Sequence, residues 1–168
     1  MKISLLFEII QGHQITDEEL YIAEGNIPVL TGKNEVKGHW NRALVEEQNL
    51  PCITYPSKAN AGEAYVQTKI FDANNTAVLI PKPEWRDKLN LHWVAFKVSN
   101  IFLDIATSKE GVSYLNKEIV EEVELEIPDM AMQDDELKVY QELMSMEAQL
   151  LAILARISIL KKKAIVLQ

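Results

Sequence analysis

Few residues of this 168-residue chain stand at spacings that could support catalysis. Asp129, with Glu136 and Lys138 after it, superficially matches the acidic pattern of Mg²⁺-dependent nucleases. That chemistry needs acids from adjacent strands brought together around the ion. Here only six residues separate the two acids, a spacing more typical of an acidic helix N-terminus after a proline. A Mg²⁺ nuclease is therefore a hypothesis that helical structure over Asp134–Lys138 would count against.

Candidate nucleophiles are isolated in the same way. Ser57 and Lys58 are adjacent, so their side chains point apart on an extended chain. Cys52 is the only cysteine and lies in a strand-like apolar run, where a core thiol is the ordinary interpretation. Metal-ligand spacing is absent from the three histidines, which are His13, His39 and His92. We therefore predict no self-sufficient active site, no metal site and no cofactor bound by this chain.

The residues best suited to chemistry are polar and aromatic side chains carried by predicted turns. They are of the types that hydrogen-bond base edges and clamp phosphates. The first cluster consists of Lys33, Asn34, Lys37, His39, Trp40, Asn41 and Arg42. The second consists of Thr54, Ser57, Lys58, Asn60 and Tyr65. Both clusters are candidate DNA-binding residues, and the alternative is an ordinary solvated loop surface.

The charge distribution bears on that choice. The formal net charge is −8, which alone argues against non-specific nucleic-acid binding. The segment from Thr31 to Lys97, however, contains nine Lys and Arg and seven Asp and Glu, a net charge of +2. The two flanking segments together therefore carry −10. The middle of the chain could therefore meet phosphate while the acidic ends face something else.

The first half of the chain is typical of a β-rich lobe, because short apolar runs alternate with glycine- and asparagine-containing turns. The predicted strands are Ile27–Leu30, Pro51–Tyr55, Ala64–Phe71 and Thr76–Ile80. Thr16 and Glu19 form a capping box, which predicts a short helix after Thr16. A helical stripe then predicts a helix over Trp85–Ile105, and strict alternation predicts a half-buried strand over Ile119–Ile127.

The C-terminal segment predicts one long helix. From about Gln133 onward there is no Gly and no Pro, and apolar residues recur at alternating spacings of four and three. The stripe comprises Val139, Leu143, Met146, Leu150, Ile153, Ile157 and Leu160. Such a heptad repeat favours a coiled coil, either in a homodimer or with a second chain. The alternative is an internal bundle helix, but no other helix of matching length is predicted. No uninterrupted run of eighteen apolar residues occurs, so no membrane span is expected.

The order of these features resembles a known family. The opening and the later strands look like the target recognition domain of the specificity (S) subunits of Type I restriction–modification systems, and of the related Type IIB systems. The segments that carry the resemblance are Phe7–Gly12, Ile15–Thr16, Gly25–Gly32, Gly38, Ile53–Gly62 and Phe71–Pro81. They continue with Gly111, Val123–Pro128, Gln133 at the head of a helix, and the coiled-coil helix itself. Their collinear order carries the resemblance more than any single motif.

The resemblance implies an α+β fold, with a β-rich target recognition domain over residues 1–128 and a spacer and dimerisation helix over residues 129–168. A full-length S subunit has two lobes and two antiparallel helices, so this chain is similar to a half-size form. The resemblance also implies a non-catalytic homodimer that recognises half of a bipartite site on double-stranded DNA. The single cysteine and the lack of a signal-peptide pattern favour a cytoplasmic location. Methyltransferase subunits, and in some systems a restriction subunit, would then be its partners, with S-adenosylmethionine on the methyltransferase. The alternative hypothesis is a coiled-coil interaction module that binds or regulates such subunits without reading DNA.

Overall fold

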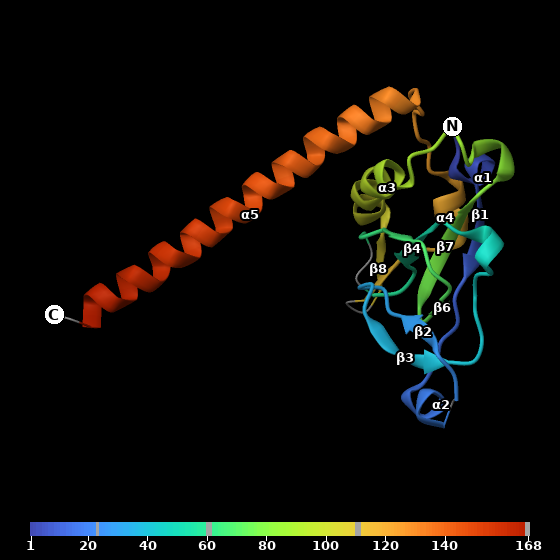
Figure 1. Cartoon of the computed structure of the whole chain (residues 1–168), viewed down its shortest axis with the longest axis horizontal. Helices are drawn as coiled ribbons and strands as arrows, with labels where there is room; N and C mark the ends of the chain where they lie inside the picture. Colours follow the sequence, from blue (N-terminus) through green and yellow to red (C-terminus); the bar gives the residue numbers. More distant parts are fainter. Residues whose placement is uncertain (23, 60–61, 110–111, 167–168) are drawn as a thin grey trace.

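The computed structural model describes the chain except residues 23, 60–61, 110–111 and 167–168. Asn60, Ala61 and Gly111, which belong to the predicted site or to the family resemblance, therefore lie outside the described residues. The elements form a β-rich lobe from which one long helix projects (Figure 1). The predicted α+β class, with short helices and a long C-terminal helix, is confirmed.

The central sheet has four strands in the order β1-β7-β4-β5, all antiparallel neighbours. These strands are β1 (Phe7–Gln11), β7 (Thr76–Pro81), β4 (Cys52–Pro56) and β5 (Tyr65–Gln67). β7 and β4 are buried along their whole length, as central strands covered on both faces must be. β5 is much shorter than the predicted strand over Ala64–Phe71, because the residues that follow Gln67 leave the sheet and are exposed up to Ile70.

Alternate side chains of the central strands enter two cores, as the pleat requires. Ile53, Tyr55 and Leu79 pack on one face, against α3 (Leu91–Ile105), α1 (Ile3–Leu6) and α4 (Lys117–Glu122). The rings of Tyr55 and Phe102 lie 5.0 Å apart at their centroids. Cys52, Val78 and Ile80 enter the second core on the other face.

A second sheet of three strands carries the loops of interest, in the order β3-β2-β6. It consists of β2 (Ile27–Leu30), β3 (Val36–Trp40) and β6 (Asp72–Ala73), with β6 parallel to β2. The short helix α2 (Asp17–Ile22) lies at this end of the lobe (Figure 1). A third sheet is the hairpin of β8 (Thr107–Lys109) and β9 (Val112–Tyr114). Two 3₁₀ turns, η1 (Glu47–Asn49) and η2 (Pro83–Trp85), complete the lobe.

Two sequence predictions are wrong in this region. The predicted strand over Ile119–Ile127 is instead the helix α4 followed by an extended segment, in which Leu125 N donates to Met1 O over 2.8 Å. Val120 and Val123, three residues apart, are both buried, so packing against α1 selects a helical turn that the alternating pattern concealed. The helix predicted from Trp85 begins at Leu91, because the side chain of Asn90 caps it by accepting from the amides of His92 and Trp93.

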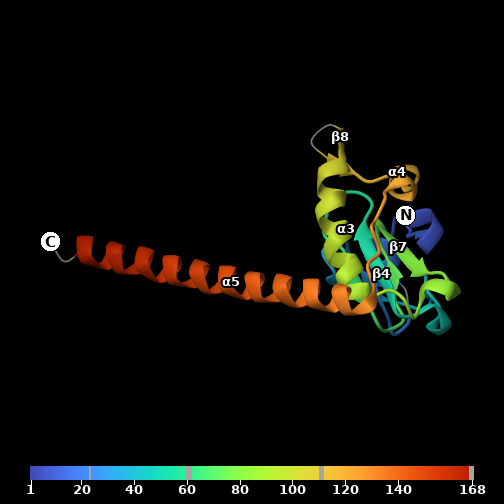
Figure 2. The same cartoon turned by 90° about the horizontal axis from the view of Figure 1, so that it is seen from above.

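The long helix α5 spans Met130–Val166, in agreement with the predicted C-terminal helix. Its 37 residues make a rod of about 55 Å at ~1.5 Å per residue. Only its first turns contact the lobe, beside α3 (Figure 2). Phe96 and Tyr140 stack there with ring centroids 3.8 Å apart. From Gln141 to Leu160 every residue is exposed.

Candidate nucleic-acid interface and spacer helix

The hairpin loop between β2 and β3 presents Lys33 and Asn34. The hydroxyl of Thr31 closes the loop by accepting from the amides of Lys33 and Glu35, each at 3.3 Å. Asn34 has a φ of 60°, a left-handed conformation that asparagine tolerates better than most residues. The loop therefore has a defined shape, with the ammonium of Lys33 exposed on it.

Gln67 connects this loop to the second predicted cluster. Its Nε2 donates to Oδ1 of Asn34 over 2.7 Å and to Oγ1 of Thr54 over 2.9 Å. Thr54 is only 2% exposed, and its own hydroxyl donates to the carbonyl of Tyr65. Thr54 thus supports the sheet and offers no surface to DNA, so we do not carry it into the proposed interface. Sequence reasoning missed Gln67, because its role depends on strand pairing.

Tyr65 lies at the edge of the same region. Its hydroxyl donates to the carboxylate of Glu63. Burial, together with Glu63, raises the pKa of Tyr65 to about 12, so the phenol stays protonated at neutral pH. Between the hairpin loop, α3 and α5 lies a concavity of about 570 Å³. It is lined by Gly32, Lys33, Gly62, Glu63, Tyr65, Ser99, Asn100, Leu103 and Tyr140.

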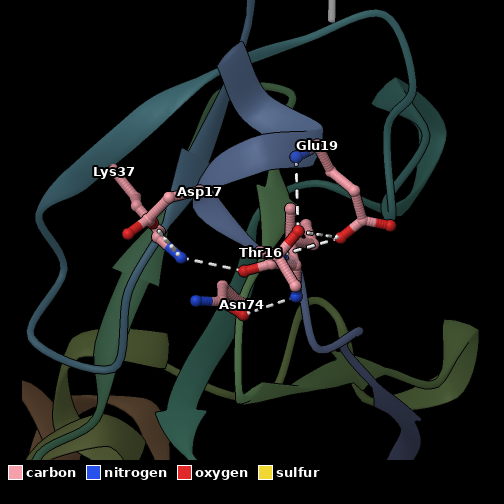
Figure 3. Close-up of polar contacts among 6 residues, drawn as sticks. Thr16, Asp17, Glu19, Lys37 and Asn74 are labelled. Atoms are coloured by element: carbon pink, nitrogen blue, oxygen red, sulfur yellow. Dashed lines mark hydrogen bonds and ion pairs between the residues drawn. The ribbon is translucent and has the colours of Figure 1, made fainter. Parts of the chain in front are cut away.

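Lys37 is engaged inside the lobe rather than free on its surface (Figure 3). Its ammonium donates to the carbonyl of Ile15 over 2.8 Å and pairs with Asp17 over 2.9 Å, which ties α2 to β3. The predicted capping box is present beside it. The amide of Glu19 donates to the hydroxyl of Thr16, and the amide of Thr16 donates to the Glu19 carboxylate. The amide and the hydroxyl of Thr16 both donate to the Glu19 carboxylate, and these two hydrogen bonds lower the pKa of Glu19.

The end of β3 carries the remaining residues of the first cluster. The guanidinium carbon of Arg42 lies 4.8 Å from the centre of the Trp40 ring, a cation–π geometry. Arg42 Nε also lies 3.6 Å from Oδ2 of Asp72, a residue that no motif in the sequence singled out. His39 and Asn41 are exposed on either side of Trp40. This group is separate from the Lys33 loop, because β3 runs between them.

Ser57 and Lys58 follow β4 and lie beside the β8–β9 hairpin. The carbonyl of Ser57 accepts from the amide of Leu115, and Lys58 forms a bridge with Tyr114. The ammonium of Lys58 is exposed and lies 6.0 Å from the centre of the Tyr114 ring. The predicted DNA-binding residues therefore occupy three places on the lobe: the β2–β3 loop, the end of β3 and the segment after β4. The two predicted clusters meet only where Gln67 bonds to Asn34 and Thr54.

The acids proposed for Mg²⁺ have other partners. Oδ1 of Asp129 accepts from the amide of Met132 over 2.9 Å, an N-cap of α5. Glu136 accepts from the indole of Trp93 over 2.9 Å and pairs with Lys97 over 2.6 Å, and these contacts lower its pKa. Asp134–Lys138 is helical, so the nuclease hypothesis loses its structural basis. Cys52 is fully buried, which raises the pKa of its thiol to about 12, in agreement with a core role.

The predicted heptad stripe lies on the exposed part of α5. Its seven residues from Val139 to Leu160 are between 43% and 60% exposed. Such a continuous uncovered apolar face indicates an interaction surface. The alternative of an internal bundle helix is wrong, because every residue of this helix from Gln141 to Leu160 is exposed.

Length and composition alone would also let α5 cross a membrane. Met130–Leu160 contains an 18-residue window with a mean hydropathy of 1.6, none of it buried. The hydropathy of this window therefore does not support the expectation that the chain has no membrane span. That expectation rested on the lack of an uninterrupted apolar run, and such a test overlooks an apolar window that contains a few charges. Glu147 and Arg156 lie inside the helix, however, and charges are costly in hydrocarbon.

Comparisons with known proteins identify the fold. No family model matches the chain, and no curated protein matches it in sequence. Solved structures do match it in three dimensions, and among them are the following three. The Type I restriction–modification S subunit from M. genitalium has a TM-score of 0.63 at 17% identity, covering 91% of this chain and 41% of that one. A subunit in a structure of Type I restriction–modification complex assembly and conformational transition has a TM-score of 0.69 at 15% identity, covering 89% and 39%.

The third structure is the HsdS subunit from Thermoanaerobacter tengcongensis, with a TM-score of 0.66 at 15% identity, covering 89% of this chain and 38% of that one. The chain thus spans about two fifths of the length of the S subunits it matches. The resemblance inferred from the sequence is confirmed at the level of fold, which this chain shares with Type I S subunits.

Proposed function

We propose that this chain is a DNA sequence-specificity component of a restriction–modification system. The observation that carries the proposal is the combination of an S-subunit fold with an uncovered apolar face along the projecting helix. The lobe would recognise half of a bipartite site through side chains such as Lys33, Arg42 and Lys58, all exposed. Methyltransferase subunits would supply S-adenosylmethionine and the catalysis, and this chain would supply neither.

We further propose that two copies pair through α5 in the cytoplasm. Two copies would present two lobes and two helices, and a two-fold pair would read inverted half-sites. The exposed part of the stripe offers one apolar side chain every three or four residues, the pattern that a partner helix covers. The separation of the lobes along the duplex would then be set by the length of the paired helices.

A methylation assay tests the DNA-reading proposal. Genomic methylation is mapped in the native host for the wild-type allele, a deletion, and the substitutions Arg42→Ala and Lys58→Ala. We expect one bipartite motif to lose its methylation in the deletion and to be methylated less completely in both variants. Lys138→Ala is the matched control, because Lys138 is an exposed cation on α5 rather than on the lobe. An unchanged methylation map in the deletion strain would reject the proposal.

The oligomeric state tests the pairing proposal. Leu150→Asp and Ile153→Asp place carboxylates in the stripe, and burying them unpaired should weaken a dimer by at least about a hundredfold. Ala148→Asp puts the same charge on the opposite side of the helix and should leave the dimer intact. Sedimentation equilibrium measures the difference. A wild-type monomer, or wild-type protein recovered with membranes and unaffected by Leu150→Asp, would contradict pairing through α5.

The second candidate function is an interaction module that binds restriction–modification subunits without touching DNA. The observation that favours it is the net charge of −8, together with the engagement of Lys37 inside the lobe. A DNA-free pull-down of the methyltransferase, with no mobility shift of duplex DNA at low salt in its presence, would support this alternative. Specific DNA binding that weakens steeply with salt would instead support recognition.

A further inference from the structure

Asp72 is a fully buried carboxylate beneath the exposed end of β3. It is 0% exposed and lies in β6, beside Val29 of β2. Its Oδ1 accepts from the amide of Ala73 over 2.8 Å. Its Oδ2 is buried without a hydrogen-bond partner, and the nearest cation is Nε of Arg42 at 3.6 Å. The carboxylate is thus only half satisfied by hydrogen bonds, although it is completely removed from water.

This arrangement does little for the stability of the fold. Removing a carboxylate from water is costly unless charge and hydrogen bonds compensate for it. The side chain of Arg42 is 51% exposed, so water would solvate the guanidinium equally well without Asp72. The desolvation of the Asp72 carboxylate therefore destabilises the lobe more than its pairing with Arg42 stabilises it. Half-satisfied buried charges of this kind are concentrated at functional sites.

The geometry restrains the guanidinium from two sides. The Trp40 ring covers one face at 4.8 Å, and Asp72 lies at the Nε edge at 3.6 Å. The backbone beyond Arg42 is also held, because the amide of Leu44 donates to the carbonyl of Phe71 over 3.0 Å. Among the described residues, neither Nη of Arg42 takes part in a hydrogen bond. From α2, the carboxylate of Glu19 also lies within electrostatic reach of Arg42, which lowers the pKa of Glu19 further than the Thr16 hydrogen bonds alone.

We propose that Asp72 is a positioning residue that holds Arg42, stacked on Trp40, with its two Nη donors directed outward to bind the O6 and N7 acceptors of one guanine in the major groove. This pairing of a planar fork with two acceptors is the commonest specific contact between proteins and DNA. The inference deepens the proposed function and rests on it. It makes Arg42 a base-reading residue, whereas Lys58, a single ammonium outside this arrangement, would contact phosphate.

Position-by-position methylation in the native host tests the proposal. Arg42→Ala and Arg42→Lys should both relax the motif at one guanine, by about five- to hundredfold, because lysine keeps the charge but loses the fork. Asp72→Asn keeps the shape and an acceptor for the Ala73 amide, and should relax the same position to a smaller extent. Asp104→Asn, an exposed carboxylate on α3, is the matched control and should change nothing.

A double substitution separates positioning from a merely structural role. If Asp72 acts through Arg42, Asp72→Asn should add no further relaxation in the Arg42→Ala background. Uniformly weaker methylation at every position in the Arg42 variants would indicate a phosphate contact and overturn the guanine assignment. Additive effects of the two substitutions, or no relaxation in Asp72→Asn, would overturn the positioning role.

A measurement on the protein without DNA tests the restraint of Arg42 by Asp72 separately from the proposed function. In the ¹⁵N-labelled full chain, the Nε–H bond of Arg42 should have a lower NMR order parameter in Asp72→Asn than in the wild type, because the ion pair no longer restrains the side chain. Equal order parameters would refute the restraint of Arg42. If the deletion strain shows no change in methylation, the guanine assignment fails with the proposed function, and the order parameters alone decide whether Asp72 orders the arginine.

Discussion

Replacing Gln133 by alanine should loosen the attachment of the long helix to the lobe. Gln133 is 0% exposed and lies in the first turn of α5. Its Oε1 accepts from the amide of Asn90 over 2.8 Å, and its Nε2 donates to the carbonyls of Lys88 and Pro128, each over 2.9 Å. One side chain thus fastens α5 to the loop before α3 and to the chain that enters α5.

The expected cost follows from these three contacts. A net ~1 kcal/mol per hydrogen bond, with three backbone groups left without a partner, gives about 2–4 kcal/mol. Urea unfolding at fixed protein concentration measures this loss by tryptophan fluorescence, since the indole of Trp93 lies at the same junction. Fixed concentration matters because pairing of two copies would add to the apparent stability.

Two further variants make the test specific. Gln133→Glu keeps the length and the acceptor for the Asn90 amide but loses both donors, so it should be destabilised as well. Gln141→Ala removes an exposed glutamine two turns along the same helix, and its stability should stay within about 0.5 kcal/mol of the wild type. A Gln133→Ala protein as stable as Gln141→Ala would refute the view that this side chain attaches the helix.

The remaining predictions concern three local contacts. Lys97 and Trp93 lower the pKa of Glu136, so its carboxylate contributes fully to the stability of the fold above the ordinary value of 4.5, and this contribution is lost as the pH falls through the lowered pKa. The unfolding midpoint of Glu136→Gln should therefore depend less on acid pH than that of the wild type, and identical acid profiles would contradict this. Cys52, with a pKa of about 12, should resist thiol reagents at about pH 8 until the protein unfolds, and rapid labelling of the native protein would disprove its burial. Thr16→Ala should cost about 1 kcal/mol through loss of the α2 cap, measured by urea unfolding, and no loss would argue against the capping box.

The division of the predicted interface shows the limit of reading contacts from sequence. Lys33 and Lys37 are four residues apart and have the same side chain. Lys33 is nevertheless exposed on a loop, whereas the ammonium of Lys37 is bonded to Ile15 and Asp17. Thr54 has the right chemistry for DNA and lies inside the sheet. Residue type and turn signals indicate what a side chain could bind, whereas strand pairing decides whether it faces solvent.

The sequence by itself determined those features whose cause is local. The heptad spacing and the absence of Gly and Pro specify α5, the Thr16–Glu19 pair specifies the start of α2, and short apolar runs specify β2, β4 and β7, because each of these signals lies within one turn or one strand. The collinear order of these elements was enough to indicate the S-subunit fold that the solved structures share.

Only the tertiary structure decided the features that join distant parts of the chain. The bond from Gln133 to Asn90 spans 43 residues, and the approach of Arg42 to Asp72 depends on β6 pairing with β2. The segment over residues 119–127 became the helix α4 and an extended end because its apolar side chains pack on α1 and the N-terminus, which outweighs the local alternation. Such contacts depend on the summed packing of the whole lobe, and no short window of sequence contains that information.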